Sequence, residues 1–398
     1  MATDTSIEWA DKTWSPLIGC DRVSEGCLGC YAISQARIRT FNPDPGIAKA
    51  FAGTVDRIND RIDWTGQVNQ LEDRLTQPLA WRKPRKVFVN SLSDLFHKNV
   101  TDEFIARIFA VMALTPQHTY QILTKRHARM RTVLNDRCDC GNGHMPGIHF
   151  RSAMAWAVSK ANPNRIPGLP DDAEHRLYHD TPWPLRNVHL GVSVEDQQWA
   201  NIRIPALLDT PAAVRWISAE PLIGPVDLLR WLKRPQIPAC DRCTQPGPLD
   251  WHSAHLWGNC RCGCHLPKPG IDWVVAGGES GPNARPPHPD WFRTLRDQCA
   301  AADVPYLLKQ WGQWGLEAPV DADGAIVRGK RGLGVTVAAD GTVYQPGDLT
   351  YPDGPRYREA VRARHDRTGH LTAMYSVGKK NAGRELDGVE HNQFPTGP

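Results

Sequence analysis

Three cysteines stand close together near the start of the sequence. Cys20, Cys27 and Cys30 all lie within the segment GCDRVSEGCLGCYA, residues 19–32. A structural zinc site requires four ligands that close a tetrahedron around the ion. A four-iron cluster that is held by only three cysteines keeps one iron open to a ligand from outside the protein. The three thiols on one short loop therefore predict a [4Fe-4S] cluster.

The open iron gives a reason for three ligands rather than four. In radical S-adenosylmethionine (SAM) chemistry, the amino acid end of SAM binds that iron, so SAM is the second cofactor that we expect. The spacing here is C-x6-C-x2-C, whereas the usual radical SAM loop is C-x3-C-x2-C. Tyr31 supplies the aromatic residue that is common beside the last cysteine. Two alternatives stay open: a zinc ion with His97 as its fourth ligand, and three thiols without a metal.

A second group of cysteines lies in two segments rich in Pro and polar residues. The sequence CDRC at 240–243 and CRCGC at 260–264 approaches the two paired-cysteine knuckles of a zinc ribbon. We favour structural zinc over a second iron-sulfur cluster, because such segments have little core of their own. The candidate ligands are Cys240, Cys243, Cys260, Cys262, Cys264, Cys138 and Cys140, with His144, His252, His255 and His265 as substitutes. Cys299 lies on the apolar side of a helical pattern, and we expect it to be buried.

Short apolar runs that alternate with helical patterns must position these loops. The clearest helical pattern follows the first run, where Phe104, Ile105 and Ile108 recur at helical spacing. Strands that alternate with helices predict an α/β fold with a parallel sheet. The runs cover residues 86–96, 119–126, 188–196, 214–222, 271–281 and 305–312, and a further strand is expected near TWSPLIG (13–19).

Polar residues end every one of these runs. In a (βα) barrel, the carboxyl ends of the strands line the mouth where chemistry occurs. The pattern therefore favours a partial or full parallel (βα) barrel over an open doubly wound sheet. The polar residues are Asn90, Ser91, Ser93, Asp94, Thr124, Lys125, Arg126, Ser193, Glu195, Asp196, Ser218, Glu220, Glu279, Ser280, Lys309 and Gln310.

Several cations are expected at the same mouth. Lys125, Arg126, Arg285 and Lys309 suit an anionic substrate, for which a nucleotide or a nucleic acid is one candidate. Trp311 and Trp314 are then available to stack a base. The equal alternative is that the cations pair with Glu195, Glu220 and Glu279, and that the two tryptophans pack under the C-terminal residues.

Composition places the chain among ordinary globular proteins. It has 398 residues, of which 41% are hydrophobic and 23% charged, and its formal net charge of +4 does not by itself indicate nucleic-acid binding. No apolar run approaches the roughly 18 residues of a membrane span, and the first residues lack the pattern of a signal peptide. We therefore expect a cytoplasmic protein without a membrane partner.

The domain organisation follows from where the alternating pattern breaks. Residues 1–315 are expected to form the barrel, with insertions at 136–185 and 233–269. Residues 316–398 are expected to form a C-terminal extension, in which Asp-Gly turn signals between β-branched runs predict a hairpin and a short helix.

The strand ends and the cysteine loop also resemble a known family. The segments TWSPLIGCDRVSEGCLGCYA, VFVNSLSDLFH, QILTKR, GVSVEDQ, ISAEPLIGPVDL, VVAGGESGPNARP, LLKQWGQW and GKKNAGRELDGVEHNQFP occur in this order. Together they are similar to the phage-associated three-cysteine-motif family of unknown function, which is related to radical SAM barrels. The resemblance implies a radical-SAM-like barrel with the cluster on Cys20, Cys27 and Cys30, and the host cytoplasm as location if a phage encodes the chain.

The sequence thus predicts an enzyme that cleaves SAM and acts on an anionic substrate. Gly277-Gly278-Glu279 is similar to the Gly-Gly-Glu of radical SAM enzymes, although here it ends a late strand. Glu279, Lys125 and Lys309 are the candidate catalytic residues. The candidate cofactor-binding residues are Asn90, Ser91, Ser93, Asp94, Ser193, Glu195, Glu220, Gly277 and Gly278. The alternative function is a non-catalytic zinc protein that binds nucleic acid or a partner protein.

Overall fold

A computed structural model gives the structure of the chain. It describes residues 3–5, 7–135, 144, 147–161, 166–232, 270–317, 334–345 and 371–395. Among these residues, no helix is long and apolar enough to cross a membrane.

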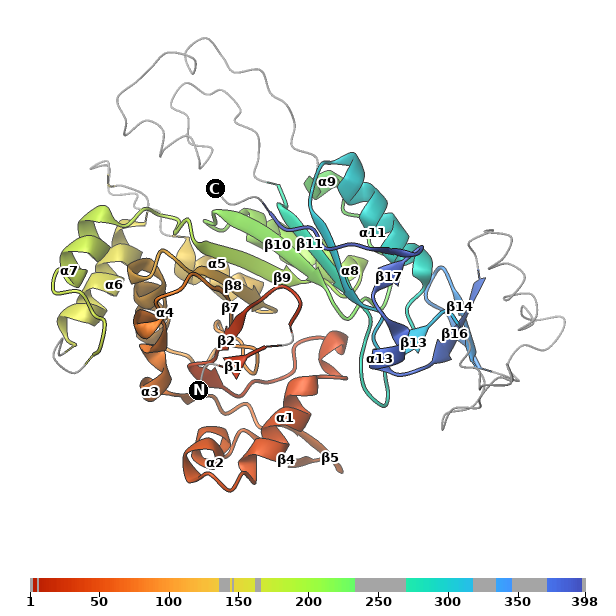
Figure 1. The fold of residues 1–398 in the computed structure, drawn as a ribbon, viewed down its shortest axis with the longest axis horizontal. Helices are drawn as coiled ribbons and strands as arrows, with labels where there is room; N and C mark the ends of the chain where they lie inside the picture. Colours follow the sequence, from red (N-terminus) through yellow and green to blue (C-terminus); the bar gives the residue numbers. More distant parts are fainter. Residues whose placement is uncertain are drawn as a thin grey trace, which may run out of the picture.

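The main sheet of the described residues has eight strands in the order β1-β2-β7-β8-β9-β10-β11-β12 (Figure 1). The short β1 (Thr3–Asp4) pairs antiparallel with β2, and every other neighbouring pair is parallel. The sheet curls from β1 at one edge to β12 at the other, so it is a partial barrel. The parallel strands are β2 (Lys12–Trp14), β7 (Lys86–Val89), β8 (Thr119–Thr124), β9 (Val188–Ser193), β10 (Val214–Ala219), β11 (Trp273–Gly277) and β12 (Tyr306–Gln310). Each predicted strand is confirmed.

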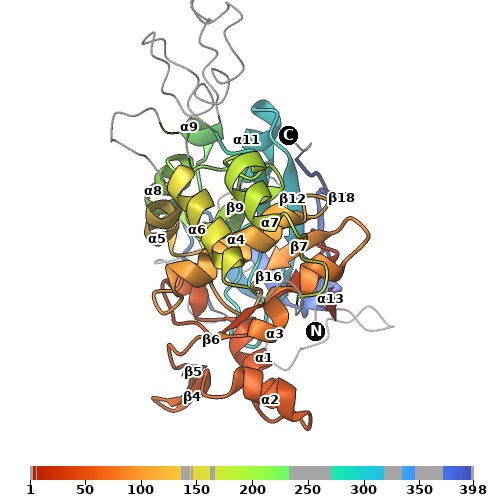
Figure 2. The same cartoon turned by 90° about the vertical axis from the view of Figure 1, so that its left-hand side faces the viewer.

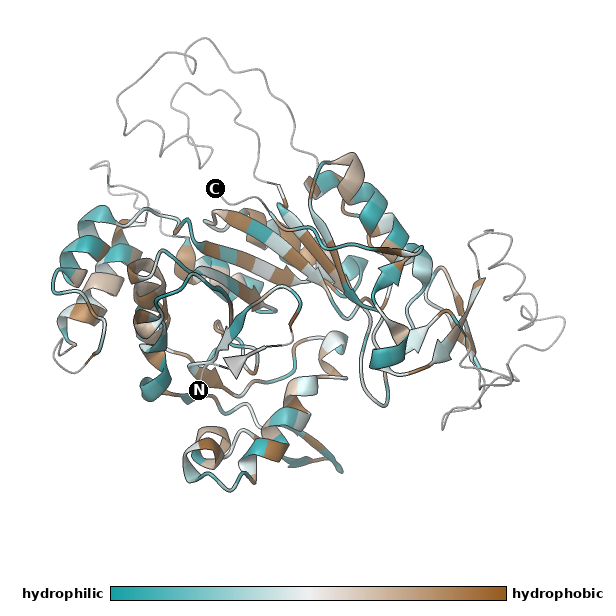
Figure 3. Ribbon diagram, in the orientation of Figure 1, coloured by the Kyte–Doolittle hydropathy of each residue, from teal (hydrophilic) through white to brown (hydrophobic). Residues whose placement is uncertain are grey.

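Helices cover the outer face of the sheet. They are α4 (Asp102–Leu114), α5 (His127–Leu134), α8 (Gln197–Leu208), α9 (Leu229–Leu232) and α11 (Pro289–Ala301). Helix α4 begins where the hydroxyl of Thr101 accepts a hydrogen bond from the amide of Phe104, at 3.2 Å. Figure 3 shows brown stretches along the central strands and teal stretches on the covering helices, as expected for amphipathic helices on a buried sheet.

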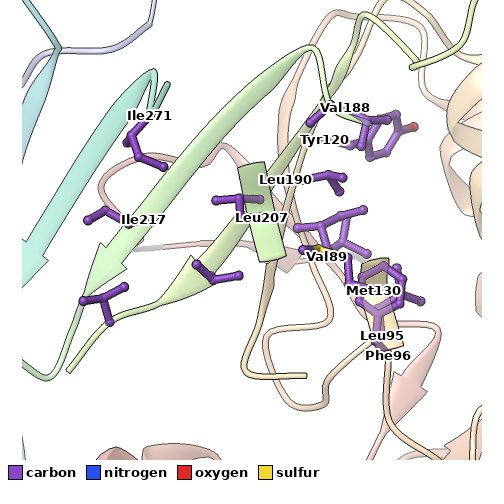
Figure 4. Close-up of a cluster of buried hydrophobic side chains, with 14 of the residues drawn as sticks. Val89, Leu95, Phe96, Tyr120, Met130, Val188, Leu190, Leu207, Ile217 and Ile271 are labelled. Carbon is purple, nitrogen blue, oxygen red and sulfur yellow. The ribbon is translucent and has the colours of Figure 1, made fainter. Parts of the chain in front are cut away.

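The main core lies between the sheet and these helices. Alternate strand residues point outward into it, including Val89, Leu190 and Ile217, and they meet Met130 of α5 and Leu207 of α8 (Figure 4). Because successive side chains of a strand point to opposite faces, the residues between them must face the concave side of the curled sheet. Burying such side chains supplies most of the favourable free energy of folding.

Aromatic residues fill the concave side of the sheet. Trp9 precedes β2 and packs edge to face against Phe88 and Trp216, with ring centroids 5.9 and 6.2 Å away. Trp273 packs against Trp216 at 5.3 Å and against Phe394 at 5.6 Å. The half-barrel therefore has a packed interior, to which residues near both ends of the described chain contribute.

The predicted insertion at 136–185 contains helices that belong to the main core. Helix α6 (Ile148–Ser159) packs against α4, and it is followed by α7 (Ala173–His175) and the π-helical turn η4 (Arg176–Asp180) (Figure 2). Phe150 and Met154 of α6 are buried in the same core as Phe109 of α4. The Pro and His content of this segment hid a helix that completes the helical layer. The predicted insertion at 233–269 lies outside the described residues.

Part of the predicted C-terminal extension forms a small second sheet together with the last two residues of the range predicted as barrel. Its order is β13 (Trp314–Gly315), β16 (Leu371–Ser376), β14 (Val335–Ala338) and β15 (Val343–Tyr344). The predicted hairpin is confirmed as β14 and β15, joined at Asp340 and Gly341. The segment in which a short helix was predicted lies outside the described residues, and a helical turn, α13 (Lys379–Ala382), occurs later.

The last described residues cover the free edge of the main sheet. They include β17 (Glu385–Leu386) and β18 (Val389–Glu390). The Leu308 amide donates to the His391 carbonyl at 3.0 Å, and the Gln393 amide donates to the Tyr306 carbonyl at 3.2 Å. These bonds pair the edge of β12, which otherwise exposes unpaired peptide groups.

Candidate cofactor site at the carboxyl ends of the strands

The three-cysteine loop leaves the carboxyl end of β2, which is the first parallel strand. It runs through β3 (Leu17–Ile18) and the 3-10 turn η1 (Glu25–Cys27) to helix α1 (Tyr31–Thr40). The loop after β7 binds the backbone at the start of the three-cysteine loop. The side-chain oxygen of Asn90 accepts from the Leu17 amide at 3.2 Å, and the Ser93 hydroxyl donates to the Gly19 carbonyl at 2.7 Å. Asn90 and Ser93, which were predicted to bind a cofactor, therefore position the cysteine loop.

A small separate core supports the other side of the loop. Ile33 of α1, Phe51 of α2 (Pro45–Phe51) and Trp64 of β5 (Arg61–Trp64) form this core with Ile18. Strand β5 pairs with β4 (Val55–Ile58), and β6 (Asn69–Gln70) pairs with β3. The chain then enters α3 (Glu72–Leu75) and η2 (Gln77–Ala80) before β7. Cys20 and Cys30 are partly buried against this core, so the loop has a fixed base.

The three thiols lie close enough to interact electrostatically. Burial raises the pKa of Cys20 to about 12, against the lowering effect of Arg126, and Cys30 raises it further. Burial also raises the pKa of Cys30, where the backbone amide of Ala32 lowers it and the neighbouring Cys27 raises it. Such thiols stay protonated at neutral pH unless a metal takes the place of the proton, because metal binding deprotonates cysteine outright.

Arg126 joins the cysteine loop to the ends of β7 and β8. One guanidinium nitrogen lies 3.6 Å from the Cys20 sulfur and donates to Asp94 at 3.0 Å. The other donates to the Asp21 carbonyl at 3.2 Å and also pairs with the Asp21 carboxylate. Asp94 accepts from Thr124 at 2.7 Å and from the Lys125 amide at 3.0 Å. The predicted residue Asp94 thus holds the arginine that contacts Cys20.

Glu195 is the centre of a second charged network, beside Cys27. Its carboxylate is fully buried, and it accepts from the Ser24 hydroxyl at 2.7 Å and from Arg203 at 2.6 Å. It also pairs with Lys125. The Ser24 oxygen lies 3.9 Å from the Cys27 sulfur. Burial raises the pKa of Glu195, but Lys125 and Arg203 outweigh it, so the pKa is lowered and the carboxylate is charged.

Two glycines bring the loop into contact with two carboxylates. A Cβ atom on Gly26 would lie 2.4 Å from Cγ of Glu195, and a Cβ atom on Gly29 would lie 2.6 Å from Oε1 of Glu279. A methyl group at either position would therefore force the loop or the glutamate side chain to move. The loop between Cys20 and Cys30 therefore rests directly on the ends of β9 and β11, and Glu279 lies beside the residue before Cys30.

The cations at the strand ends are paired. Lys125 pairs with Glu195, Lys309 lies 2.9 Å from Glu220, and Arg285 lies 2.7 Å from Glu279. The sequence left two alternatives for these cations, an anionic substrate or ion pairs with the glutamates. The structure shows the ion pairs. A desolvated ion pair fixes the positions of both partners, so these side chains order the mouth.

The tryptophans also agree with the packing alternative. Trp311 is 3% exposed, and its indole donates to the Glu385 carbonyl at 2.7 Å. Trp314 lies in β13, and its indole donates to the Ala284 carbonyl at 2.8 Å. Trp311 is thus buried and Trp314 is half-buried, and base stacking stays a prediction.

The remaining predicted residues line the same end of the sheet. Glu220 accepts from Gln310 at 2.9 Å, and Gln310 also donates to Ser280 at 3.2 Å. The Ser91 carbonyl accepts from the Tyr31 hydroxyl at 2.8 Å, and Ser193 is buried at the end of β9. A Cβ atom on Gly278 would lie 2.0 Å from the Trp311 carbonyl oxygen, and one on Gly277 would lie 3.1 Å from the Glu220 carboxyl carbon. The two glycines therefore have a packing reason within the protein.

Sequence reasoning missed Arg203, Ser24 and Asp21. Arg203 is fully buried in α8, and its guanidinium lies 3.9 Å from the Trp199 ring centroid. Two of its nitrogens, Nε and Nη2, have no hydrogen-bond partner among the described residues. Burial lowers the pKa of Arg203, while Glu195 and then Cys27 raise it. The available signal was an arginine among the apolar positions of a helix.

Only the first of the predicted metal sites lies within the residues that the structure describes. Cys20, Cys27 and Cys30 lie on one described loop, whereas Cys138, Cys140 and the five cysteines of 240–264 lie outside the described residues. Cys299 is buried as expected. Within the described ranges, no three His, Cys, Asp or Glu side chains are grouped closely enough to hold a single metal ion. His97, proposed as a zinc ligand, instead lies 3.3 Å from Asp21.

The donor set suits an anionic cluster. Three thiolates and a four-iron core carry net negative charge in the oxidised state, and two arginines flank the loop. Arg126 contacts Cys20, and Arg203, with two unpartnered nitrogens, lies near enough to Cys27 to alter its own pKa. These cations compensate negative charge on the sulfurs. The charges beside Cys20 and Cys27 therefore suit a negatively charged group on this loop, and the [4Fe-4S] cluster stays a prediction.

Comparison with known proteins identifies a family but no activity. A family model described as "Protein of unknown function (DUF5131)" matches residues 4–395. No curated protein and no solved structure gives a match. The phage association and the relation to radical SAM enzymes, which the resemblance implied, stay predictions.

Proposed function

The chain belongs to this family of unknown function, and we propose that it is a radical SAM-type enzyme whose cluster is held by Cys20, Cys27 and Cys30. The observation that carries the proposal is the position of the loop. The loop that carries the three cysteines follows the first parallel strand, and its Gly26 and Gly29 lie against Glu195 and Glu279, at the carboxyl ends of β9 and β11. This is the end of an α/β barrel at which cofactors and substrates bind.

Cys20, Cys27 and Cys30 would hold the cluster, which would supply the electron for reductive cleavage of SAM to methionine and an adenosyl radical able to abstract hydrogen from a substrate. The chain's own residues have supporting tasks. Arg126 and Arg203 balance the charge of the sulfurs, and Asn90 and Ser93 fix the loop. We assign to Glu279 and Glu220, which pair with Arg285 and Lys309, the task of accepting hydrogen bonds from the ammonium or ribose hydroxyls of SAM.

The substrate stays a prediction. Three of the cations that suggested an anionic substrate are paired with Glu195, Glu220 and Glu279, and Arg126 is paired with Asp21 and Asp94. They therefore contribute less positive potential than the sequence implied. The proposal therefore concerns the cofactor and the reaction class, and an anion such as a nucleotide or nucleic acid is tested afterwards.

The decisive experiment is anaerobic reconstitution of the full chain with iron and sulfide, followed by SAM and dithionite. We expect about four irons per chain, a brown protein and 5'-deoxyadenosine as product. Protein that binds zinc, remains colourless and leaves SAM intact would support the alternative of a non-catalytic zinc protein.

Cysteine variants assign the iron to the loop. Cys20→Ala, Cys27→Ala and Cys30→Ala should each lose most of the iron and all SAM cleavage, because two sulfurs hold the cluster poorly. Cys299→Ala is the matched control, since Cys299 is a buried residue of α11 and does not belong to the loop. Retention of SAM cleavage by all three loop variants would contradict the assignment. Circular dichroism should show the same fold for all four.

A further inference from the structure

A pocket of about 300 Å³ opens at the amino ends of the strands, opposite the cysteine loop. We call it the lower pocket, and its main lining residues are Lys86, Thr119, Gln121, Arg186, His189 and Phe394. The volume is at the lower end of the range for pockets that bind small molecules. Lys86 and Thr119 are the first residues of β7 and β8, so the pocket opens into the concave side of the sheet at the amino ends of its strands.

Two buried polar side chains at the inner end of the lower pocket lack partners. Gln121 and His189 are 2% and 6% exposed, and they are paired directly in the register of β8 and β9. Gln121 donates to the Trp9 carbonyl at 3.2 Å, but its Oε1 has no partner among the described residues. Nδ1 of His189 likewise has none there. Buried polar atoms of this kind are costly to leave unsatisfied.

These two atoms offer complementary hydrogen bonds to a ligand. Oε1 of Gln121 is an acceptor, whereas Nδ1 of a neutral imidazole is a donor or an acceptor according to the tautomer. Burial lowers the pKa of His189 to about 4, so the ring is neutral at pH 7. An adjacent acceptor and ring nitrogen match the alternating donors and acceptors along the edge of a nucleobase.

Cations lie at the outer end of the lower pocket. Lys86 and Arg186 are both exposed side chains that line it. The Lys86 ammonium lies 3.8 Å from the ring centroid of Phe394, which forms one wall. Two cations beside an opening suit a phosphate group, which accepts charge-assisted hydrogen bonds from both types of side chain.

We propose that the lower pocket binds a nucleoside monophosphate, with its base edge at Gln121 and His189 and its phosphate at Lys86 and Arg186. The proposal does not depend on the cluster. Chemistry in α/β barrels occurs at the carboxyl ends of the strands, so a ligand at the amino ends acts by binding. It stabilises the interior into which Phe394 packs, since a ligand that binds only the folded state raises its stability.

Isothermal titration calorimetry on the purified full chain tests the proposal. AMP, GMP, CMP and UMP are titrated separately at physiological salt, together with inorganic phosphate. We expect at least one nucleotide to bind with a Kd below about 1 mM, and phosphate alone to bind at least about tenfold more weakly. If none of the four nucleotides binds more tightly than phosphate, the proposal is wrong.

Variants at the two ends of the lower pocket locate the binding. Gln121→Leu should weaken the nucleotide at least about tenfold by leaving a base group unpaired. Arg186 lies on the surface, so Arg186→Gln should keep the fold. It should weaken nucleotide binding by a similar factor and make the affinity depend less on salt. The exposed Lys83→Gln, just before β7, is the charge-matched control and should bind as the unaltered chain does. Unchanged affinity in Arg186→Gln would overturn the proposal even if Gln121→Leu unfolds.

Discussion

At the scale of single residues, buried charge organises the mouth of the half-barrel. Glu195 accepts from Arg203 and Ser24 and pairs with Lys125, while it touches the loop at Gly26. The two cations, Lys125 and Arg203, are 19% and 0% exposed beside this one carboxylate. Removing the carboxylate therefore leaves two buried positive charges uncompensated, which is more costly than the loss of one hydrogen bond.

Glu195→Gln should lower the free energy of unfolding by roughly 3–5 kcal/mol, because it breaks a buried charge network. Urea denaturation measures the change. The control is Glu72→Gln, whose carboxylate pairs with Arg107 and is 61% exposed. Such a surface pair contributes less than about 1 kcal/mol. Equal effects of the two substitutions would show that the Glu195 network does not stabilise the fold.

Gly26→Ala tests the contact between the loop and the sheet. The added Cβ would meet Glu195 at 2.4 Å, so the loop must move away from the strand end. We expect a large loss of iron after reconstitution, with the circular dichroism spectrum unchanged. Gly224→Ala is a milder control, because its nearest atom lies at 3.3 Å. Normal iron content in Gly26→Ala would separate cluster binding from this contact.

At the scale of elements, the C-terminal segment from β17 to Gln393 packs on the main sheet in addition to forming the pair β17 and β18. His391 and Gln393 pair with the backbone of β12, and the Gln393 carbonyl accepts from the Trp273 indole at 2.9 Å. Asp387 accepts from Arg293 and Arg296 of α11, at 2.7 and 2.8 Å. The segment thus holds both the edge strand and the helix beside it.

A chain truncated after Leu386 should lose this protection. We expect lower stability and a tendency to self-associate, because β12 becomes a free edge and Trp273 is uncovered. Size-exclusion chromatography with light scattering measures the oligomeric state. A chain that ends at Pro395 is the control and should remain as the full chain does. If both run alike and unfold alike, the segment does not protect the edge.

Sequence patterns predicted the elements better than their contacts. The strands from β7 to β12 and the helix α4 have strong periodicity, so their positions were correct. The position of α6 was missed, since His and Pro around it obscure the apolar face that packs on α4. The cysteines were found from spacing alone. Their contacts with Arg126 and Glu195 were not, because pairing across a curled sheet depends on register and on loop paths that no local pattern encodes.

At the scale of the whole molecule, buried histidines make stability depend on pH. Burial lowers the pKa of His189 to about 4, and it also lowers the pKa of His118 from its ordinary value of 6.5. In the unfolded chain both rings take up a proton near pH 6.5, whereas the folded protein resists protonation. The unfolded state therefore binds more protons as the pH falls, and the fold loses stability below pH 6.5.

Urea denaturation between pH 7 and pH 4 should show this loss. The His189 shift alone corresponds to roughly 3 kcal/mol, most of it lost by pH 4. His189→Gln removes the titrating group, so its stability should fall less over the same interval. Asp387, whose pKa is lowered to about 2 by Arg293 against the effect of burial, contributes only below pH 4. Parallel curves for the two proteins above pH 4 would rule out His189 as the source.

The interior of the half-barrel has a consequence for biosynthesis. Trp9 precedes Phe394 by 385 positions in the sequence (394 − 9), yet both pack into the cluster around Trp273. A nascent chain therefore carries an incomplete hydrophobic interior from the synthesis of Trp9 until Phe394 has been added. We expect chaperones that bind exposed aromatic surface to protect such a polypeptide until Phe394 completes the cluster.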